Sequence, residues 1–96
     1  RRNFVVKSLN SIKGINCLTP NGAFYVFPSC KGLLNKKTKL SIDTDFVQKL
    51  LEKANVAVVQ GSAFGLDGYF RISYATSMEN LKKAMDRIKF FCESLN

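Results

Sequence analysis

Three stretches of the chain carry apolar residues at helical spacing, so we expect three helices. The first covers residues 1–13, and Gly14 is suited to ending it. The second begins near Asp43, whose carboxylate can cap the free amides of the first turn. The third opens with Thr76-Ser77-Met78-Glu79, which is typical of a capping box. The apolar faces consist of Phe4, Val5, Leu9 and Ile12; Phe46, Val47, Leu50, Leu51 and Ala54; and Leu81, Ala84, Met85, Ile88, Phe91, Cys92 and Leu95.

The segments between these helices favour short strands. Residues 15–18 and 23–27 flank the turn sequence Thr19-Pro20-Asn21-Gly22, which predicts a hairpin over residues 15–27. The continuous apolar segment 56–59 is typical of a strand buried on both faces.

A last strand is expected over residues 69–74, while residues 29–41 have no period and predict a basic loop. This order of elements predicts an α+β fold, in which a small mixed or antiparallel β-sheet packs against helices. We expect residues 1–96 to form one domain.

Strand 69–74 contains one arginine within an otherwise largely apolar run. Strand geometry places Tyr69, Arg71 and Ser73 on one face and leaves an apolar set on the other. A guanidinium group cannot lose its charge, so removal from water requires an anionic partner. Two partners are open: Asp67 or another carboxylate at a sheet edge, or an anionic ligand.

The net charge of +8 raises a second hypothesis, a module that binds nucleic acid or another polyanion. Lysine predominates among the basic residues, and no cluster interleaves aromatic residues with arginine as single-strand binders do. A basic surface without nucleic-acid binding is therefore favoured. The polyanion alternative would depend on Lys36, Lys37 and Lys39. No apolar run approaches the roughly 20 residues that span a bilayer, so no membrane partner is expected.

Candidate catalytic and metal-binding groups are scarce. Cys17, Cys30 and Cys92 are widely spaced and the chain has no histidine, so we expect no metal site and free, mostly buried thiols in a reducing cytoplasm. The glycine-bracketed loop 61–65 lacks the ending of a P-loop, which favours a tight strand connection. By itself the chain does not have the residues of a complete enzyme, and we expect no catalytic residue in it.

Three ordered blocks of the sequence resemble the C-terminal segment of class I aminotransferases. They are Pro20-Asn-Gly-Ala-Phe-Tyr-Val-Phe-Pro28, Val56-Ala-Val-Val-Gln-Gly-Ser-Ala-Phe-Gly65 and Gly68-Tyr-Phe-Arg-Ile-Ser-Tyr-Ala-Thr-Ser77. The resemblance covers nearly the whole chain and is strongest to aspartate aminotransferases of bacterial type, which have fold type I and use pyridoxal 5'-phosphate. One departure is Gln60, where the family commonly has proline.

The resemblance implies that residues 1–96 are the small domain of such an enzyme, a fragment without the large domain. It assigns to Arg71 the α-carboxylate of the amino-acid or 2-oxo-acid substrate, and it suggests that Phe24 lies beside this arginine. The Schiff-base lysine and the groups that hold the cofactor belong to the large domain, so no cofactor-binding residue is expected here. A homodimer is implied for the full-length protein, with aspartate and 2-oxoglutarate or a different amino acid as substrates. The isolated chain is expected to be inactive.

Overall fold

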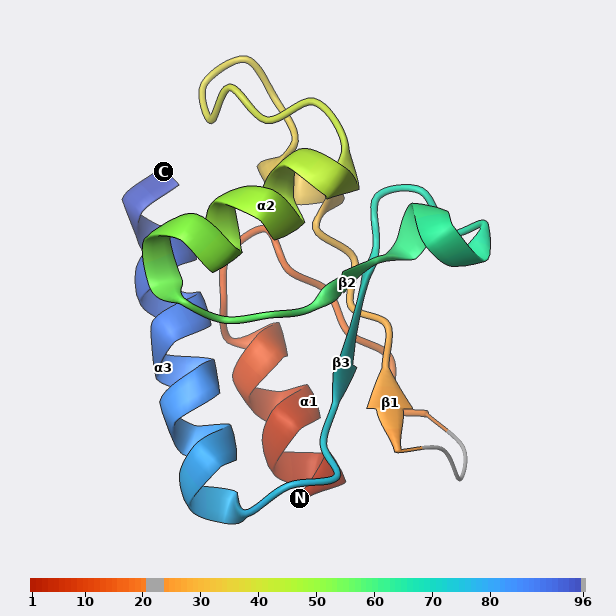
Figure 1. The fold of residues 1–96 in the computed structure, drawn as a ribbon, viewed down its shortest axis with the longest axis vertical. Coiled ribbons are helices and arrows are strands. Elements are labelled where there is room, and N and C mark those ends of the chain that lie inside the picture. The colour runs from red at the N-terminus through yellow and green to blue at the C-terminus, as the bar shows by residue number, and fades with distance from the viewer. Residues whose placement is uncertain (21–23, 96) are drawn as a thin grey trace.

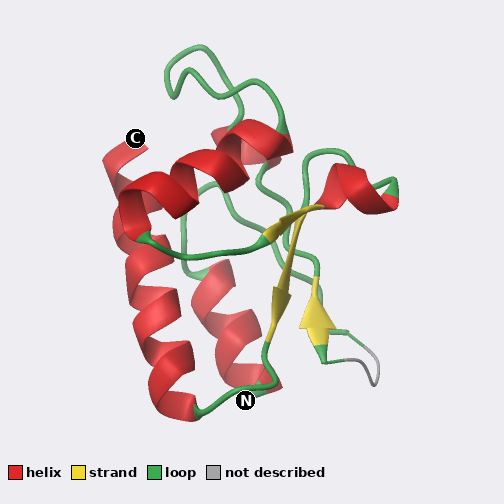
Figure 2. Ribbon diagram, viewed as in Figure 1, coloured by secondary structure: helices red, strands yellow, loops and turns green. Residues whose placement is uncertain are grey.

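The computed structural model describes residues 1–20 and 24–95, which form three α-helices, two 3₁₀-helices and three short strands. The three α-helices pack on one side of the strands, as Figures 1 and 2 show. In chain order the elements are α1 (Arg2–Asn10), β1 (Tyr25–Val26), η1 (Lys31–Leu33), α2 (Asp43–Ala54), β2 (Val59–Gln60), η2 (Gly61–Phe64), β3 (Phe70–Ser73) and α3 (Met78–Leu95).

The strands form a single antiparallel sheet in the order β1-β3-β2. Tyr25 of β1 lies opposite Ser73, and Val59 of β2 lies opposite Arg71. The last strand in the sequence is therefore the central one. The predicted α+β class, with a small antiparallel sheet packed against helices, is confirmed.

The hairpin predicted over residues 15–27 is replaced by a different pairing. Strand β1 pairs with β3, and the segment 15–18 is joined to residue 29 by a bridge between Asn16 and Ser29, with N–O distances of 3.1 and 2.7 Å. Turn residues predict that a chain reverses, but the sheet decides which strand accepts the hydrogen bonds. The predicted turn at 19–22 and the expected start of the strand at 23 fall partly on residues 21–23, which lie outside the described residues.

Strand β2 also differs from its prediction. Only Val59 of the segment 56–59 is in the strand; Ala57 is exposed, and none of the four residues is fully buried. The segment was expected to be buried on both faces, but β2 is an edge strand of a sheet that helices cover on one face only. Its residues are therefore only partly buried.

Helix starts follow the predictions closely, although the capping groups differ. Helix α2 begins at Asp43 as expected, but Asp45 supplies the capping carboxylate, whose Oδ2 accepts hydrogen bonds from the backbone N–H groups of Ser41 (3.0 Å) and Ile42 (3.4 Å). At α3, Ser77 Oγ accepts a hydrogen bond from the backbone N–H of Asn80. Glu79 pairs with Lys83 instead of closing a capping box.

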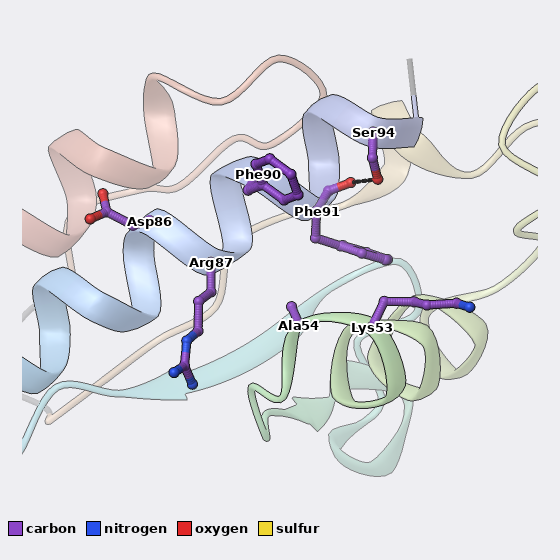
Figure 3. A pocket seen from close by; sticks show the side chains of 7 residues that line it. All are labelled: Lys53, Ala54, Asp86, Arg87, Phe90, Phe91 and Ser94. Atoms are coloured by element: carbon purple, nitrogen blue, oxygen red, sulfur yellow. Dashed lines mark hydrogen bonds between the residues drawn. The ribbon is translucent and has the colours of Figure 1, made fainter.

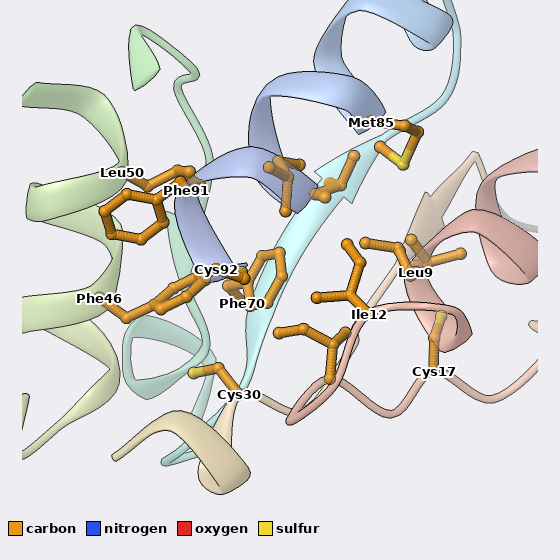
Figure 4. Packing of buried hydrophobic residues seen from close by; sticks show 14 of the residues in the cluster. Leu9, Ile12, Cys17, Cys30, Phe46, Leu50, Phe70, Met85, Phe91 and Cys92 are labelled. Atoms are coloured by element: carbon orange, nitrogen blue, oxygen red, sulfur yellow. The ribbon is translucent and has the colours of Figure 1, made fainter. Parts of the chain in front are cut away.

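The hydrophobic core fills the space between the sheet and the helices (Figure 4). The Phe46 ring lies between two other rings, with centroid distances of 5.0 Å to Phe70 and 5.8 Å to Phe91. Phe70 and Phe46 have no exposed surface, and burying a side chain of this size contributes about 1.5–3 kcal/mol. The core thus fixes one face of β3 against α2 and α3.

Candidate functional site

Arg71 is the half-buried polar centre of the sheet face that the helices leave uncovered. Its neighbours in β3, Phe70 and Ile72, are buried on the helix side, so alternation turns Arg71 to the other face. Tyr69 and Ser73 share that face and are half-buried and exposed, respectively. The two faces predicted for this strand are therefore confirmed.

Two aromatic rings lie against the Arg71 guanidinium. Its Cζ atom lies over the Tyr25 ring at 4.4 Å from the centroid and over the Phe64 ring at 4.7 Å. Phe27 packs edge-on against Phe64, with centroids 5.8 Å apart. Each cation–π contact at a partly exposed site contributes about 0.5–1 kcal/mol, and together they restrict the orientation of the guanidinium.

No carboxylate neutralises Arg71 within residues 1–20 and 24–95. The ion pairs of this described part join Lys49 to Glu52 and Lys83 to Glu79, so the predicted alternative of Asp67 as a partner is wrong. Arg71 is also in the central strand and not at a sheet edge. No side-chain hydrogen bond among these residues uses its guanidinium either, so none of the described residues occupies its N–H donors.

Phe24 lies at the start of the same region, but its surroundings differ from those expected. Its carbonyl accepts a hydrogen bond from the N–H of Tyr74, and its ring contacts the Tyr74 ring at 6.3 Å. The register of β1 with β3 places Phe24 on the Ile72 face of the sheet, whereas Tyr25 lies on the face of Arg71. Phe24 is 66% exposed, and its contact with a substrate stays a prediction.

Sequence reasoning did not identify Tyr25 and Phe64 as neighbours of Arg71. Tyr25 was detectable in principle, because strand alternation places it one position from Phe24 on the opposite face. Phe64 lies in η2, seven residues before Arg71, and nothing in its local spacing indicates that the loop folds back over β3. Its position depends on how that loop is anchored.

The η2 loop is anchored at its base and at its first turn. The N–H of Gly61 donates to the Tyr69 carbonyl at 2.7 Å, and a Cβ atom at Gly61 would collide with the carbonyl oxygens of Leu66 and Tyr69. Asp43 Oδ2 accepts a hydrogen bond of 2.7 Å from the N–H of Ser62, which ties η2 to the start of α2. Only glycine fits the close approach at position 61.

Asp43 is only 2% exposed, yet its carboxyl group stays ionised at neutral pH. Burial by itself raises the pKa of Asp43, but hydrogen bonds from Ser62, from its own backbone and from Gly68 outweigh burial and lower the pKa below the usual value of 3.8. The carboxylate therefore holds the loop as an anion.

A groove of about 440 Å³ between α2 and α3 lies on the helical side of the molecule. Figure 3 shows its lining, in which Lys53 and Ala54 come from α2 and the remaining residues from α3. The exposed Phe90 ring gives it an apolar wall. Since Arg71 does not line this groove, we do not assign the candidate site to it.

Thiols and acidic residues form no metal centre in the part of the chain that the structure describes. All three cysteines are buried and reduced, as predicted. Burial is the main cause that raises the pKa of Cys30 and of Cys92 to about 12, and it also raises the pKa of Cys17. These thiols stay protonated at neutral pH and are poor nucleophiles.

The basic residues form more than one group: Lys39, Lys49 and Lys53 line one pocket, and other lysines lie far from it. The loop with Lys36, Lys37 and Lys39 lies at one end of the molecule and the start of α3, with Lys82 and Lys83, lies at the other (Figure 1). This separation gives no support to the polyanion alternative. Among the described residues, no helix has the length and apolar character needed to cross a lipid bilayer.

Comparisons with known proteins agree on one family. The family model for aminotransferase class I and II matches residues 1–88. The chain is 57% identical to a probable aspartate/prephenate aminotransferase of Rhizobium leguminosarum bv. phaseoli, and 53% identical to the aspartate aminotransferase of Rhizobium meliloti. These alignments cover 96% and 100% of this chain but only 24% of each relative.

Solved structures give the same result. The crystal structure of the aspartate aminotransferase from Rhizobium meliloti superposes with a TM-score of 0.92, at 53% identity, over 96% of this chain and 24% of that one. The alanine aminotransferase from Pyrococcus furiosus superposes with a TM-score of 0.88, at 37% identity, over 97% and 23%. Sequence and fold together show that the chain belongs to the aminotransferase class I and II family.

Proposed function

We propose that residues 1–96 are the C-terminal small domain of a pyridoxal-phosphate-dependent aminotransferase, and that Arg71 binds the α-carboxylate of its substrates. Relatives that match the whole chain are named aspartate or aspartate/prephenate aminotransferases, which supports transamination between aspartate and 2-oxoglutarate. Another amino acid is the alternative, because an alanine aminotransferase has nearly the same fold. An α-carboxylate is common to all these substrates, so the role of Arg71 does not depend on which one is used.

The state of Arg71 is the observation that carries this proposal. Its charge has no carboxylate partner among the described residues, while the rings of Tyr25 and Phe64 hold its Cζ atom at 4.4 and 4.7 Å. A planar, permanently charged fork can hold a carboxylate through two parallel hydrogen bonds. Each such bond contributes roughly 1.5–3 kcal/mol in a desolvated site. Held in this way, the substrate has a defined orientation of its Cα–H bond.

The cofactor itself must be held by residues outside this chain. All eleven lysines of the chain are exposed, so none lies in a buried setting that would suit a Schiff base. Pyridoxal phosphate supplies the electron sink for transamination when it is bound. We therefore propose that the remaining three quarters of the protein hold the cofactor, and that the full-length protein is a cytoplasmic homodimer.

The isolated chain is expected to be inactive for the same reason. An assay of the purified 96-residue chain with aspartate, 2-oxoglutarate and pyridoxal phosphate tests this expectation. We expect no turnover above the rate of free pyridoxal phosphate. Turnover at the rate of an enzyme would contradict the proposal that the residues that hold the cofactor lie outside this chain.

The role of Arg71 is tested in the full-length protein. Arg71→Ala should raise KM for both substrates and lower kcat/KM by an amount equivalent to about 2–4 kcal/mol, because the substrate carboxylate loses both hydrogen bonds to its charged partner. Arg71→Lys should restore little, since an ammonium group cannot form the paired hydrogen bonds of a guanidinium. Arg87→Ala, an exposed position on α3, is the control and should leave the kinetics unchanged. Wild-type kinetics for Arg71→Ala would refute the proposal.

A further inference from the structure

We propose that Asp43 is a positioning residue for the carboxylate site, acting through the η2 loop and Phe64 on the orientation of Arg71. This inference rests on the function proposed for Arg71. Asp43 lies at the start of α2 and Arg71 in β3, so the two residues belong to different elements of the fold. The link between them is a chain of contacts, and each of these is defined by the structure.

The first contact joins α2 to η2. Asp43 is the single charged residue in the buried set of the described chain, at 2% exposed. Its Oδ2 accepts the N–H of Ser62 at 2.7 Å across 19 residues of sequence. An ionised acceptor makes this a charge-assisted hydrogen bond, which is about twice as strong as a neutral one.

The second contact joins η2 to the guanidinium. Ser62 and Phe64 lie in the same turn of 3₁₀-helix, so fixing the backbone at Ser62 limits where the Phe64 ring can go. The C-cap of this turn, Gly65, has φ +78°, and no atom beyond its chain neighbours lies within 4 Å of the position that a Cβ would occupy there, so no side chain packs against the loop at this point. The Asp43 bond therefore holds a loop that packing at Gly65 does not restrain.

The ring position matters because Phe64 is one of two groups that orient Arg71. Phe64 is 46% exposed and Tyr25 is 41% exposed, so neither is locked in the core. If η2 shifts, the Phe64 ring leaves the guanidinium and Arg71 gains rotameric freedom. A carboxylate would then bind to a guanidinium group that must first be ordered, and the entropy cost of this ordering weakens binding.

The test uses the full-length enzyme and the variants Asp43→Asn, Asp43→Ala and Phe64→Leu. We expect KM for the amino acid and for the oxo acid to rise about 3- to 10-fold in each variant, with kcat per active site changed less than about twofold. Asp45→Asn is the matched control: it lies in the same helical turn, its hydrogen bonds go to Ser41 and Ile42, and KM should stay unchanged.

A double-mutant cycle separates positioning from a purely structural role. Asp43→Asn should raise KM further by less than about twofold when Phe64→Leu is already present, because both substitutions remove the same link. Unchanged KM in Asp43→Asn, with only a lower melting temperature, would overturn the inference. Additive effects of Asp43→Asn and Phe64→Leu would overturn it too. Wild-type kinetics for Arg71→Ala would instead refute the proposed function, so the two failures are distinguishable.

Discussion

The two faces of β3 differ in every property that decides what a side chain can do. Phe70 has no exposed surface and packs against Phe46 at 5.0 Å, whereas Arg71, the next residue, is half-buried between two rings that are themselves exposed. One strand thus supplies both the core and the candidate site. Because the core face holds the backbone of β3 in place, the opposite face can present a charged group in a defined position.

Breaking the core face should have the largest effect. Phe70→Ala should destabilise the 96-residue chain by about 3–5 kcal/mol, because it leaves a cavity beside Phe46. That loss is a large part of the stability of a typical domain. Urea unfolding followed by circular dichroism measures it. Arg71→Ala is the matched control one residue away and should lower the free energy of unfolding by only about 1–2 kcal/mol, through the loss of its two cation–π contacts, so equal losses at the two positions would contradict the division between the faces.

Acid should weaken the hydrogen bond between Asp43 and Ser62, which joins α2 to η2. The pKa of Asp43 is lowered in the folded chain, so its contribution to stability is present above the usual value of 3.8 and is lost as pH falls through the lower, folded value. Asp43→Asn should cost about 1–2 kcal/mol at neutral pH, since the charge assistance of the Ser62 bond is lost.

The measurement is the free energy of unfolding of wild type and Asp43→Asn between about pH 7 and pH 2. The difference in the free energy of unfolding between wild type and Asp43→Asn should be constant at neutral pH. It should decrease below about pH 4, where the aspartate becomes protonated. Asp45→Asn serves as a comparison for general effects of removing a negative charge from this helix turn. A difference that grows on acidification would mean that folding raises the pKa of Asp43 instead of lowering it.

The smallest effect is expected at Gln60, where the family commonly has proline. Gln60 has φ −63° and ψ 136°, which proline adopts without strain, and Val59 before it is extended as a residue before proline must be. The N–H of Gly61 donates to Tyr69, so alternation in the antiparallel pair leaves the N–H of Gln60 outside the ladder.

Gln60→Pro should therefore stabilise the chain by about 0.4–1 kcal/mol, because proline restricts the unfolded chain more than the folded one. Thermal unfolding measures the change. Gln48→Pro, inside α2, is the opposite control and should unfold that helix. A lower melting temperature for Gln60→Pro would show that the N–H of Gln60 is used in the folded chain.

Much of the fold was predictable because it depends on local patterns. Apolar spacing located the three helices, and alternation in residues 69–74 separated Arg71 from the buried residues beside it. The resemblance of three sequence blocks to class I aminotransferases agrees with the family that the comparisons show. The errors were in strand pairing, since the hairpin over residues 15–27 and the buried strand at 56–59 both required knowledge of which edges the sheet leaves open.

Alternation along residues 69–74 was enough to predict a permanently charged arginine on the polar face of an apolar strand. The three-dimensional fold was needed to find that no described carboxylate neutralises it, that Tyr25 and Phe64 lie against it, and that Asp43 anchors the loop that carries Phe64. Periodicity and charge are properties of neighbouring residues, whereas the contacts of Arg71 with Tyr25 and of Asp43 with Ser62 join segments far apart in the sequence. Even Phe64, seven residues before Arg71, reaches it only because the loop folds back over β3 in the centre of the sheet.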